Sequence, residues 1–205
     1  MAGAKRKPYH HGDLFGALLA AAERLLRHGG IAELGMRAVA REVGVSHTAA
    51  QHHFGDMAGL LAELAAVGYR RLASALEATR DLAASERARR VALAKAYVDF
   101  ARQNPALFAL MFRHEMLDMR RPSLAQASGT ALRALAGSLV GSAETVGELS
   151  RPSALRITAG WGFVHGLATL LVDKRLRGVL KATPMFDDPD DLVDAVLDAT
   201  TLTQP

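Results

Sequence analysis

The sequence predicts an all-α protein of about nine helices, and both composition and hydrophobic spacing support this. Half of the 205 residues are hydrophobic, and Ala, Leu and Arg dominate the chain. That mixture favours helix over strand. Apolar residues recur at three- and four-residue steps, and no segment shows the strict alternation of a half-buried strand. Gly, Pro and capping residues then divide the chain into separate helices.

The first helix follows an N-terminal arm of about twelve residues. Asp13 is a suitable N-cap for it, because its side chain can accept hydrogen bonds from free backbone N–H groups. Apolar residues at helical spacing give this helix one buried face. Gly29-Gly30 ends it near His28.

Two short helices are expected next, at about Met36–Val43 and His47–Phe54. Gly44 can end the first in a left-handed conformation, and Ser46 is a good N-cap for the second. Two short helices joined by such a tight turn form a helix-turn-helix, whose second helix can enter the DNA major groove. The sequence therefore predicts DNA recognition at this end of the chain.

The remaining helices are longer and follow without a flexible linker. Asp56 caps a helix that reaches about Thr79. The other expected helices span about 85–103, a segment from Pro105, about 122–142, about 152–174, and a ninth from Pro189, with loops at 143–150 and 178–188.

Charge is distributed unevenly along the chain, although its formal net charge is only +4. The N-terminal tip is basic, whereas no Lys or Arg follows Lys181. The acidic residues of that last stretch are Asp187, Asp188, Asp190, Asp191, Asp194 and Asp198. This asymmetry favours contact between nucleic acid and the N-terminal part.

Several classes of protein and site are excluded or disfavoured. The chain has no cysteine, which excludes disulfides, thiol catalysis and Cys-ligated zinc. No secretory signal is visible, and the most apolar segment, 154–172, contains Arg156, His165 and glycines. That segment is therefore interpreted as a buried or interface helix rather than a membrane span. A cytoplasmic protein is expected.

Enzymatic and metal chemistry are not expected either. The sequence shows no nucleophile with an ordered base, no Gly-rich phosphate loop and no paired metal ligands. His52 and His53 are adjacent on a helix and point about 100° apart, so they cannot easily hold one ion. We therefore expect no catalytic residues, no cofactor and no metal.

The N-terminal third resembles the TetR-type repressor family. The segments that carry the resemblance are GDLFGALLAAAERLLRHGG, MRAVAREVGVSHTAAQHHF and GDMAGLL, and PYHHGDL is similar to the lead-in of one subgroup. In the second half, Trp161, His165 and Gly166 of WGFVHG resemble the Trp-His-Gly signature of that subgroup's C-terminal domain. The resemblance implies a helix-turn-helix domain at 1–55 and a helical regulatory and dimerisation domain at 56–205.

The resemblance also implies the partners. These are a palindromic operator in double-stranded DNA, a second copy of the chain, and a small-molecule effector in the C-terminal domain that releases the DNA. Dimerisation is assigned to the expected helices 8 and 9. The apolar residues that agree with this are Leu167, Leu170, Leu171, Leu192, Val193, Val196 and Leu197.

Polar residues of the arm and the helix-turn-helix are the candidate DNA contacts. They are Lys5, Arg6, Lys7, Arg37, Ser46, His47, Thr48, Gln51, His52 and His53. Such side chains can bind phosphates or base edges, and basic arms can follow the minor groove. Taken one at a time and without the resemblance, each residue is better interpreted as part of a solvated polar face, whereas the resemblance favours DNA contact for the group.

Two positions depart from the pattern of the family. Gln51 stands where the family usually has Tyr, often preceded in this subgroup by Pro where Ala50 stands, and Met57 stands where it usually has Lys. The usual Tyr and Lys hold DNA phosphates, so their loss removes a ring and a charge that position the helix. The alternative hypothesis is therefore a divergent helical dimer with weakened DNA binding that acts through ligand or protein contacts.

Aromatic, Met and His side chains of the second half are the candidate ligand contacts. They are Phe100, Phe108, Met111, Phe112, Met116, Trp161 and His165. Pockets with such linings suit apolar ligands. Trp161 and His165 lie four residues apart and share a helix face. The alternative interpretation of each residue is ordinary hydrophobic core.

Overall fold

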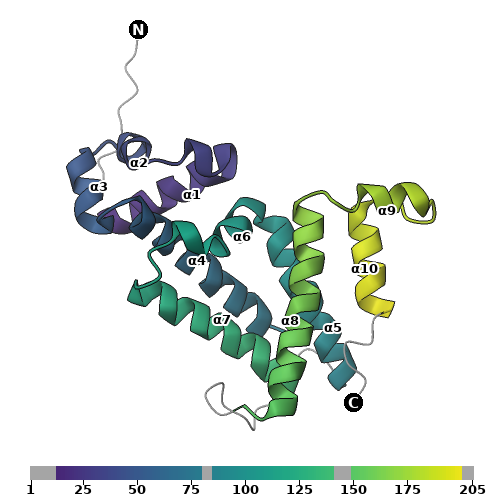
Figure 1. The fold of residues 1–205 in the computed structure, drawn as a ribbon. Helices are drawn as coiled ribbons and strands as arrows, with labels where there is room; N and C mark the ends of the chain where they lie inside the picture. The colour runs from purple at the N-terminus through teal and green to yellow at the C-terminus, as the bar shows by residue number, and fades with distance from the viewer. Residues whose placement is uncertain (1–12, 80–84, 141–148, 200–205) are drawn as a thin grey trace.

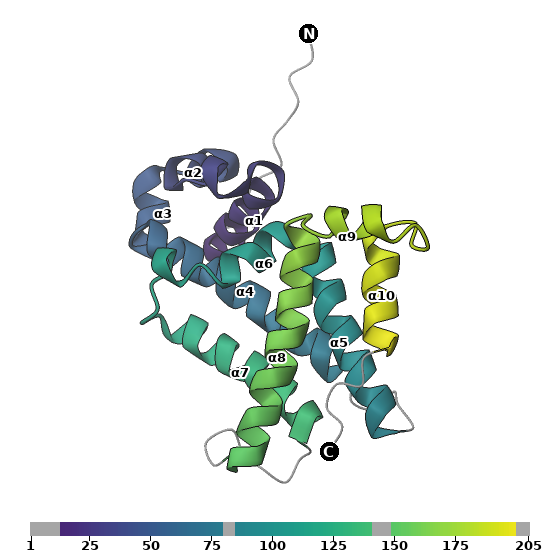
Figure 2. The same ribbon diagram turned by 45° about the vertical axis from the view of Figure 1, so that its right-hand side comes forward.

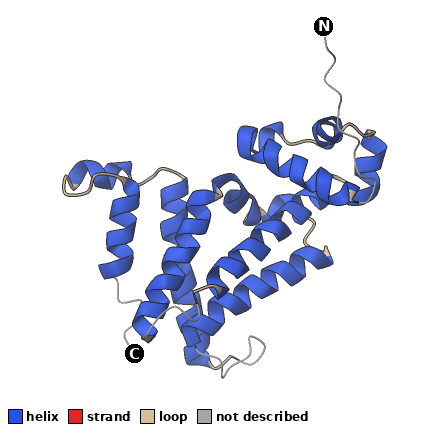
Figure 3. Cartoon of the chain, turned by 180° about the vertical axis from the view of Figure 1, so that it is seen from behind, coloured by secondary structure: helices blue, strands red, loops and turns tan. Residues whose placement is uncertain are grey.

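The structure is a computed structural model that describes residues 13–79, 85–140 and 149–199. Figure 3 draws helices in blue and strands in red, and these described residues contain no strand. They form ten α-helices and one short 3-10 helix. The all-α prediction is confirmed.

Three helices form a bundle at the N-terminal end: α1 (Leu14–Glu33), α2 (Met36–Val43) and α3 (His47–Phe54). The two short helices have the predicted bounds. Gly44 adopts the left-handed conformation with φ 82°, and the Oγ of Ser46 accepts a hydrogen bond from the backbone N–H of Ala49 at 3.1 Å. Both ends of the turn are thus fixed by local interactions, which is why the sequence predicts them well.

Gly30 ends the regular helix that begins at Leu14, as predicted, and a second, short helical segment follows it within α1. Its φ of 67° and ψ of −166° bend the chain, and one further helical turn continues to Glu33. A residue with a Cβ adopts this conformation rarely, so the glycine permits the bend.

The long helix α4 (Met57–Glu77) connects the N-terminal bundle with the rest of the molecule (Figure 1). Asp56 caps it as predicted, because its side chain accepts a hydrogen bond from the N–H of Gly59 at 2.9 Å. α4 packs against α1, α3, α5, α6 and α7. Its central position makes it the element shared by both ends of the chain.

The second half consists of six more α-helices and the 3-10 helix. They are α5 (Glu86–Gln103), α6 (Pro105–Met111), η1 (His114–Met116), α7 (Pro122–Val140), α8 (Arg151–Val172), α9 (Arg177–Ala182) and α10 (Pro189–Ala199). In Figures 1 and 2, α8 stands between α7 on one side and α10 on the other, and it packs against α5.

The short helix α9 (Arg177–Ala182) corrects one prediction, because it overlaps the first part of the loop expected at 178–188. No side chain caps it, and Gly178 falls within it, so the local sequence does not signal a helix. It forms because Leu176 is buried and Leu180 packs on the core.

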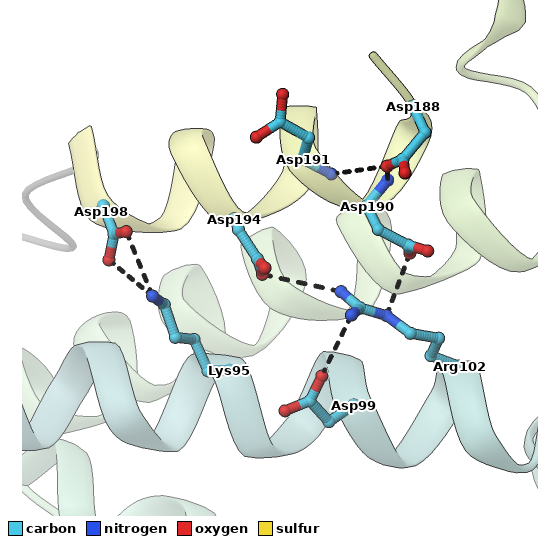
Figure 4. A network of polar contacts seen from close by, with 8 residues as sticks. All are labelled: Lys95, Asp99, Arg102, Asp188, Asp190, Asp191, Asp194 and Asp198. Atoms are coloured by element: carbon cyan, nitrogen blue, oxygen red, sulfur yellow. Dashed lines mark hydrogen bonds and ion pairs between the residues drawn. The ribbon is translucent and has the colours of Figure 1, made fainter. Parts of the chain in front are cut away.

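Acidic residues of α10 hold it against α5, as Figure 4 shows. Arg102 of α5 forms ion pairs with Asp190 at 3.0 Å and with Asp194 at 3.6 Å. Lys95 pairs with Asp198 at 2.8 Å, and this interaction raises the pKa of Lys95. The acidic end of the chain is therefore used within the subunit.

The apolar residues of α10 also face inward, which corrects their assignment to a subunit interface. Leu192, Val193 and Leu197 are buried against the core of the same subunit. By contrast, α8 exposes large apolar residues, among them Leu155 (62% exposed) and Leu170 (41% exposed). By length and composition alone α8 would also suit a membrane span, but a single helix of this kind is weak evidence, because the core helix of a soluble protein passes the same test.

Candidate DNA interface and ligand cavity

The helix α3 divides clearly into a buried and an exposed side. Ala50 and Phe54 are buried, and the ring of Phe54 packs on Phe15 of α1 with the ring centroids 5.2 Å apart. The exposed candidates of the turn and the helix are Ser46, His47, Thr48, Gln51 and His52. The buried side fixes α3 to α1, which leaves the opposite side available to a groove of DNA.

The other DNA candidates differ in their surroundings. Arg37 is exposed at the start of α2. His53 is half-buried, and its ring lies edge-on to Phe15 at a centroid distance of 6.2 Å, so it also supports the packing of α3. Lys5, Arg6 and Lys7 lie outside the described residues.

An ion pair that the sequence analysis missed fastens α4 to α1. Arg71 donates to both carboxylate oxygens of Glu23, at 2.6 and 2.8 Å, and Arg27 also donates to Glu23 at 2.9 Å. These cations lower the pKa of Glu23. Glu23 and Arg71 are separated by 48 residues, so no local pattern could have indicated the pair.

A cavity of about 420 Å³ lies in the second half, bounded by α4, α7, the segment around η1 and one side of α8. Its described lining contains no Asp, Glu, Lys or Arg. Leu, Met and aromatic side chains form most of the wall, and the polar lining residues are Tyr69, Tyr97, His114, Ser128 and Trp161. Such a cavity can enclose a small apolar molecule with few polar groups.

Only some of the predicted ligand residues line this cavity. Met111, Phe112 and Trp161 line it. Phe108 and His165 lie behind Phe112, with ring-centroid distances to it of 5.2 and 4.3 Å. Phe100 is buried in the hydrophobic core, and the half-buried side chain of Met116 packs against this core.

Tyr97 is the central polar group of the wall, and the sequence analysis missed it. Its hydroxyl lies 3.1 Å from Nδ1 of His165 and 3.4 Å from Nε1 of Trp161. Because the indole N–H can only donate, the arrangement that satisfies all three groups has Tyr97 accepting from Trp161 and donating to a neutral His165. Burial lowers the pKa of His165 and raises that of Tyr97, which favours these neutral forms.

A second tyrosine, Tyr69 of α4, also escaped the sequence analysis. Its hydroxyl donates to the backbone oxygen of Met111 at 2.9 Å, and burial raises the pKa of Tyr69 to about 12. Both tyrosines lie on helices with many apolar residues, and each contacts a segment distant in sequence. Their only sequence signal was a phenol group on a buried helix face.

No metal site is formed by three or more His, Asp or Glu side chains in the part of the chain that the structure describes. The geometry instead presents two separate features, an exposed polar helix face and an apolar cavity. They lie at opposite ends of α4.

Comparison with known families decides the identity. Residues 18–64 match the family described as "Bacterial regulatory proteins, tetR family", and residues 91–200 match "Tetracyclin repressor-like, C-terminal domain". The chain belongs to the TetR family. It is therefore a DNA-binding transcriptional regulator and not an enzyme, and the family implies binding of both DNA and an effector.

Solved structures share the fold of this TetR regulator. A protein of unknown function from Rhodococcus sp. RHA1 is 33% identical, with a TM-score of 0.73, over 94% of this chain and 96% of that chain. The TetR family transcriptional regulator PfmR from Thermus thermophilus is 18% identical, with a TM-score of 0.58, over 88% and 91% of the two chains. The multidrug binding protein EbrR, complexed with imidazole, is 20% identical, with a TM-score of 0.53, over 93% and 94%. Comparison with curated proteins gives no match.

The two departures from the TetR pattern lie close to each other along the chain. Gln51 is exposed on α3, whereas Met57 is half-buried at the first position of α4 and packs on the core. Neither side chain carries a charge. The junction between α3 and α4 therefore lacks the cation that the family usually places at the position of Met57.

Proposed function

We propose that this TetR regulator is a homodimeric repressor that binds a palindromic operator and is released by a small, largely apolar molecule. The cavity carries the proposal. Its volume of about 420 Å³ lies in the range of small-molecule pockets. The absence of Asp, Glu, Lys and Arg from its described lining favours an uncharged ligand, because burying an unpaired ion is costly.

Three of the proposed ligand residues, Met111, Phe112 and Trp161, would touch the effector directly. The others would support the wall, as Phe108 and His165 do behind Phe112. The hydrogen bonds that Tyr97 forms, accepting from Trp161 and donating to His165, also support the proposed membership of the Trp-His-Gly subgroup. A relative of the same fold is named a multidrug binding protein, which is compatible with an apolar effector.

At the DNA end, we propose that the exposed side of α3 reads the operator. Thr48 and Gln51 would reach base edges, and His47 and His52 would reach bases or phosphates. Arg37 and the basic arm at Lys5–Lys7 would hold the backbone. His53 is the weakest member of the set, because its ring already packs against Phe15.

We propose that α8 supplies most of the dimer interface. The helix α10, whose Leu192, Val193 and Leu197 are buried within the subunit, would contribute only the residues that it leaves exposed. Exposed apolar and small residues form a stripe along α8 that includes Leu155, Gly162 and Leu170. A Cβ added at Gly162 or Gly166 would meet no atom of the subunit within 4 Å, so these glycines do not serve packing within it. Close approach of a second α8 would explain them.

The division into domains and the location of the protein complete the proposal. Gly55, with φ 78°, separates α3 from α4, and we place the domain boundary there, between residues 1–55 and 56–205. A regulator that binds DNA in a bacterial cell acts in the cytoplasm, and we propose that location.

The decisive experiment is selection of bound sequences from a random double-stranded DNA pool at moderate salt. We expect enrichment of a palindrome whose half-sites are separated by about one helical turn, or a multiple of it, as two symmetric recognition helices require. Binding to the selected duplex should weaken steeply as salt increases.

The opposite result would favour the alternative function. Weak binding without enrichment would mean that Gln51 and Met57 mark a loss of specificity. The matched variants Gln51→Tyr and Met57→Lys then test whether the docking geometry survives, because restoring the ring and the charge strengthens binding only if α3 still reaches the groove.

A further inference from the structure

We propose that Arg121 couples the cavity to the recognition helix, by holding the end of α3 against α4 from the segment that lines the cavity. This inference rests on the proposed function, because it describes how an occupant of the cavity would change operator binding. It assigns a positioning role to a residue that touches neither DNA nor ligand.

The guanidinium of Arg121 bridges two elements. Its Nη1 lies 3.3 Å from Oε1 of Glu63 on α4, and its Nη2 donates to the backbone oxygen of Phe54, the last residue of α3. Ser123 donates to the same oxygen of Glu63 at 2.9 Å. Glu63 is only 7% exposed, so its carboxylate depends on these two partners for compensation.

Phe54 is a sensitive position for such a contact. The last carbonyl groups of a helix lack intrahelical partners, and a cation there also interacts favourably with the helix dipole. α3 has only eight residues, too few to be stable alone, so tertiary contacts set its orientation. The guanidinium of Arg121, bound to the carbonyl of the last residue of α3, therefore helps to fix the orientation of α3 relative to α4.

Gly59 shows that this close approach is built into the fold. A Cβ at this position would collide with the backbone oxygen of Phe54 and with Nη2 of Arg121. Only glycine leaves room for both groups at the first turn of α4. No local sequence pattern indicates this junction, because Glu63 and Arg121 are separated by 58 residues.

The same segment forms part of the cavity wall on its other side. Leu117 and Met119 precede Arg121, Leu124 follows it, and all three line the cavity. The backbone N–H of Asp118 donates to the carbonyl of Ala58 at 3.2 Å, which fastens the segment to the start of α4. An occupant that displaces Leu117, Met119 or Leu124 therefore also moves Arg121.

Coupling of this kind is reciprocal, so it can be measured without a known effector. Trp161 is the only tryptophan of the chain and lines the cavity. Operator binding should change its fluorescence in the wild-type protein. Arg121→Gln should remove that change and weaken operator affinity by about 5- to 150-fold, the usual span of coupling between sites.

Arg120→Gln is the matched control. Arg120 is the exposed neighbour of Arg121, so the same change of charge is made without breaking the bridge. Its operator affinity and fluorescence response should remain those of the wild type. Equal behaviour of the two variants in both measurements would overturn the proposal.

A second variant and a second readout guard against a folding defect. Arg121→Lys keeps the positive charge near Glu63 but lacks the fork that holds two acceptors at once, so it should lose the response as well. Hydrogen exchange of the α3 amides needs no DNA, and it should accelerate in both Arg121 variants and not in Arg120→Gln. Unchanged exchange in α3 would contradict the proposal.

The two proposals fail in different ways. If the wild-type protein enriches no operator, the proposed function fails, and the exchange experiment still tests the bridge. If the wild-type protein binds its operator but Arg121→Gln and Arg121→Lys respond as it does, the function stands and the coupling role of Arg121 is wrong.

Discussion

The helices α4 and α8 have almost the same length, 21 and 22 residues, but the subunit encloses them very differently. α4 has buried residues along its whole length, including Leu60, Leu64, Leu72 and Leu76, and packs against five other helices. α8 buries only one narrow side, and it exposes Leu155, Trp161 and Leu170. The apolar side chains of α4 are covered within one chain, whereas several large apolar side chains of α8 are not.

This difference is the reason for proposing that a second subunit covers α8. A monomeric soluble protein rarely leaves a long apolar helix face uncovered, and such a face usually marks an interaction site. The sequence of α8 alone favours a buried or interface helix over a membrane span. Only its position in the fold shows that the apolar face points outward, where a second subunit can cover it.

Truncation of a core residue in α4 should produce the largest effect. Leu64 is fully buried, so Leu64→Ala leaves a cavity and should lower the free energy of unfolding by about 2–5 kcal/mol. Leu155→Ala on α8, whose side chain is 62% exposed, should change the stability of the isolated subunit far less. Chemical denaturation of both variants at low protein concentration measures the contrast, and equal losses would refute the distinction between the two helices.

Enlarging a glycine on the open side of α8 should affect association instead of folding. A side chain at Gly162 meets nothing within the subunit, and Leu is a better helix former than Gly, so Gly162→Leu should not destabilise the monomer. It should weaken the dimer by about 1–3 kcal/mol, because the extra volume prevents close approach of the partner helix. Analytical ultracentrifugation measures this, and Gly178→Leu on α9 serves as the control. A dimer of unchanged strength would remove Gly162 from the interface.

The parts of the molecule that the sequence predicts well are those fixed by neighbouring residues. Gly44 and Ser46 define the turn between α2 and α3 through local backbone conformation and a cap, so its bounds were correct. α9 was missed because packing of Leu176 and Leu180, rather than a cap, holds it.

The candidate sites follow the same physical rule. Phe112 and Trp161 were identified as wall residues from their type and helix spacing, and both line the cavity. Tyr97 was not identified, because its hydrogen bonds with Trp161 and His165 join two helices, α5 and α8, that are distant in sequence. The inward side of α10 was also unpredictable, because an amphipathic helix does not reveal whether its apolar face meets its own subunit or another.

A larger side chain in the cavity wall should lower the affinity for an apolar ligand without destabilising the fold. Gly129 of α7 lines the cavity, and a Cβ there meets only the flexible end of Arg133, at 3.4 Å. Gly129→Leu should therefore fold normally but occupy ligand space. We expect the affinity for the uncharged fluorophore N-phenyl-1-naphthylamine to fall by about tenfold or more, which is about 1.4 kcal/mol. Gly129→Ala is the matched control, and unchanged dye binding in Gly129→Leu would show that the dye occupies another place.

The smallest expected effect concerns the ion pair that joins α4 to α1. Arg71 and Arg27 lower the pKa of Glu23 below its ordinary value of 4.5, so the folded state favours the ionised carboxylate. The resulting stabilisation is complete at neutral pH and is lost as the pH falls below 4.5 through the folded pKa. Because the side chain of Arg71 is 45% exposed to solvent, which screens the pair, Glu23→Gln should cost only about 0.2–1 kcal/mol at neutral pH.

Urea denaturation of Glu23→Gln and wild type at neutral and acidic pH tests this sign. The difference between the two proteins should shrink toward zero on acidification, because the wild-type carboxylate then becomes neutral like the glutamine. A difference that stays constant or grows in acid would mean that Glu23 stabilises the α1–α4 contact by packing rather than by charge. In that case the connection between the DNA-binding end and α4 would be insensitive to salt, whereas a true ion pair weakens as ionic strength increases.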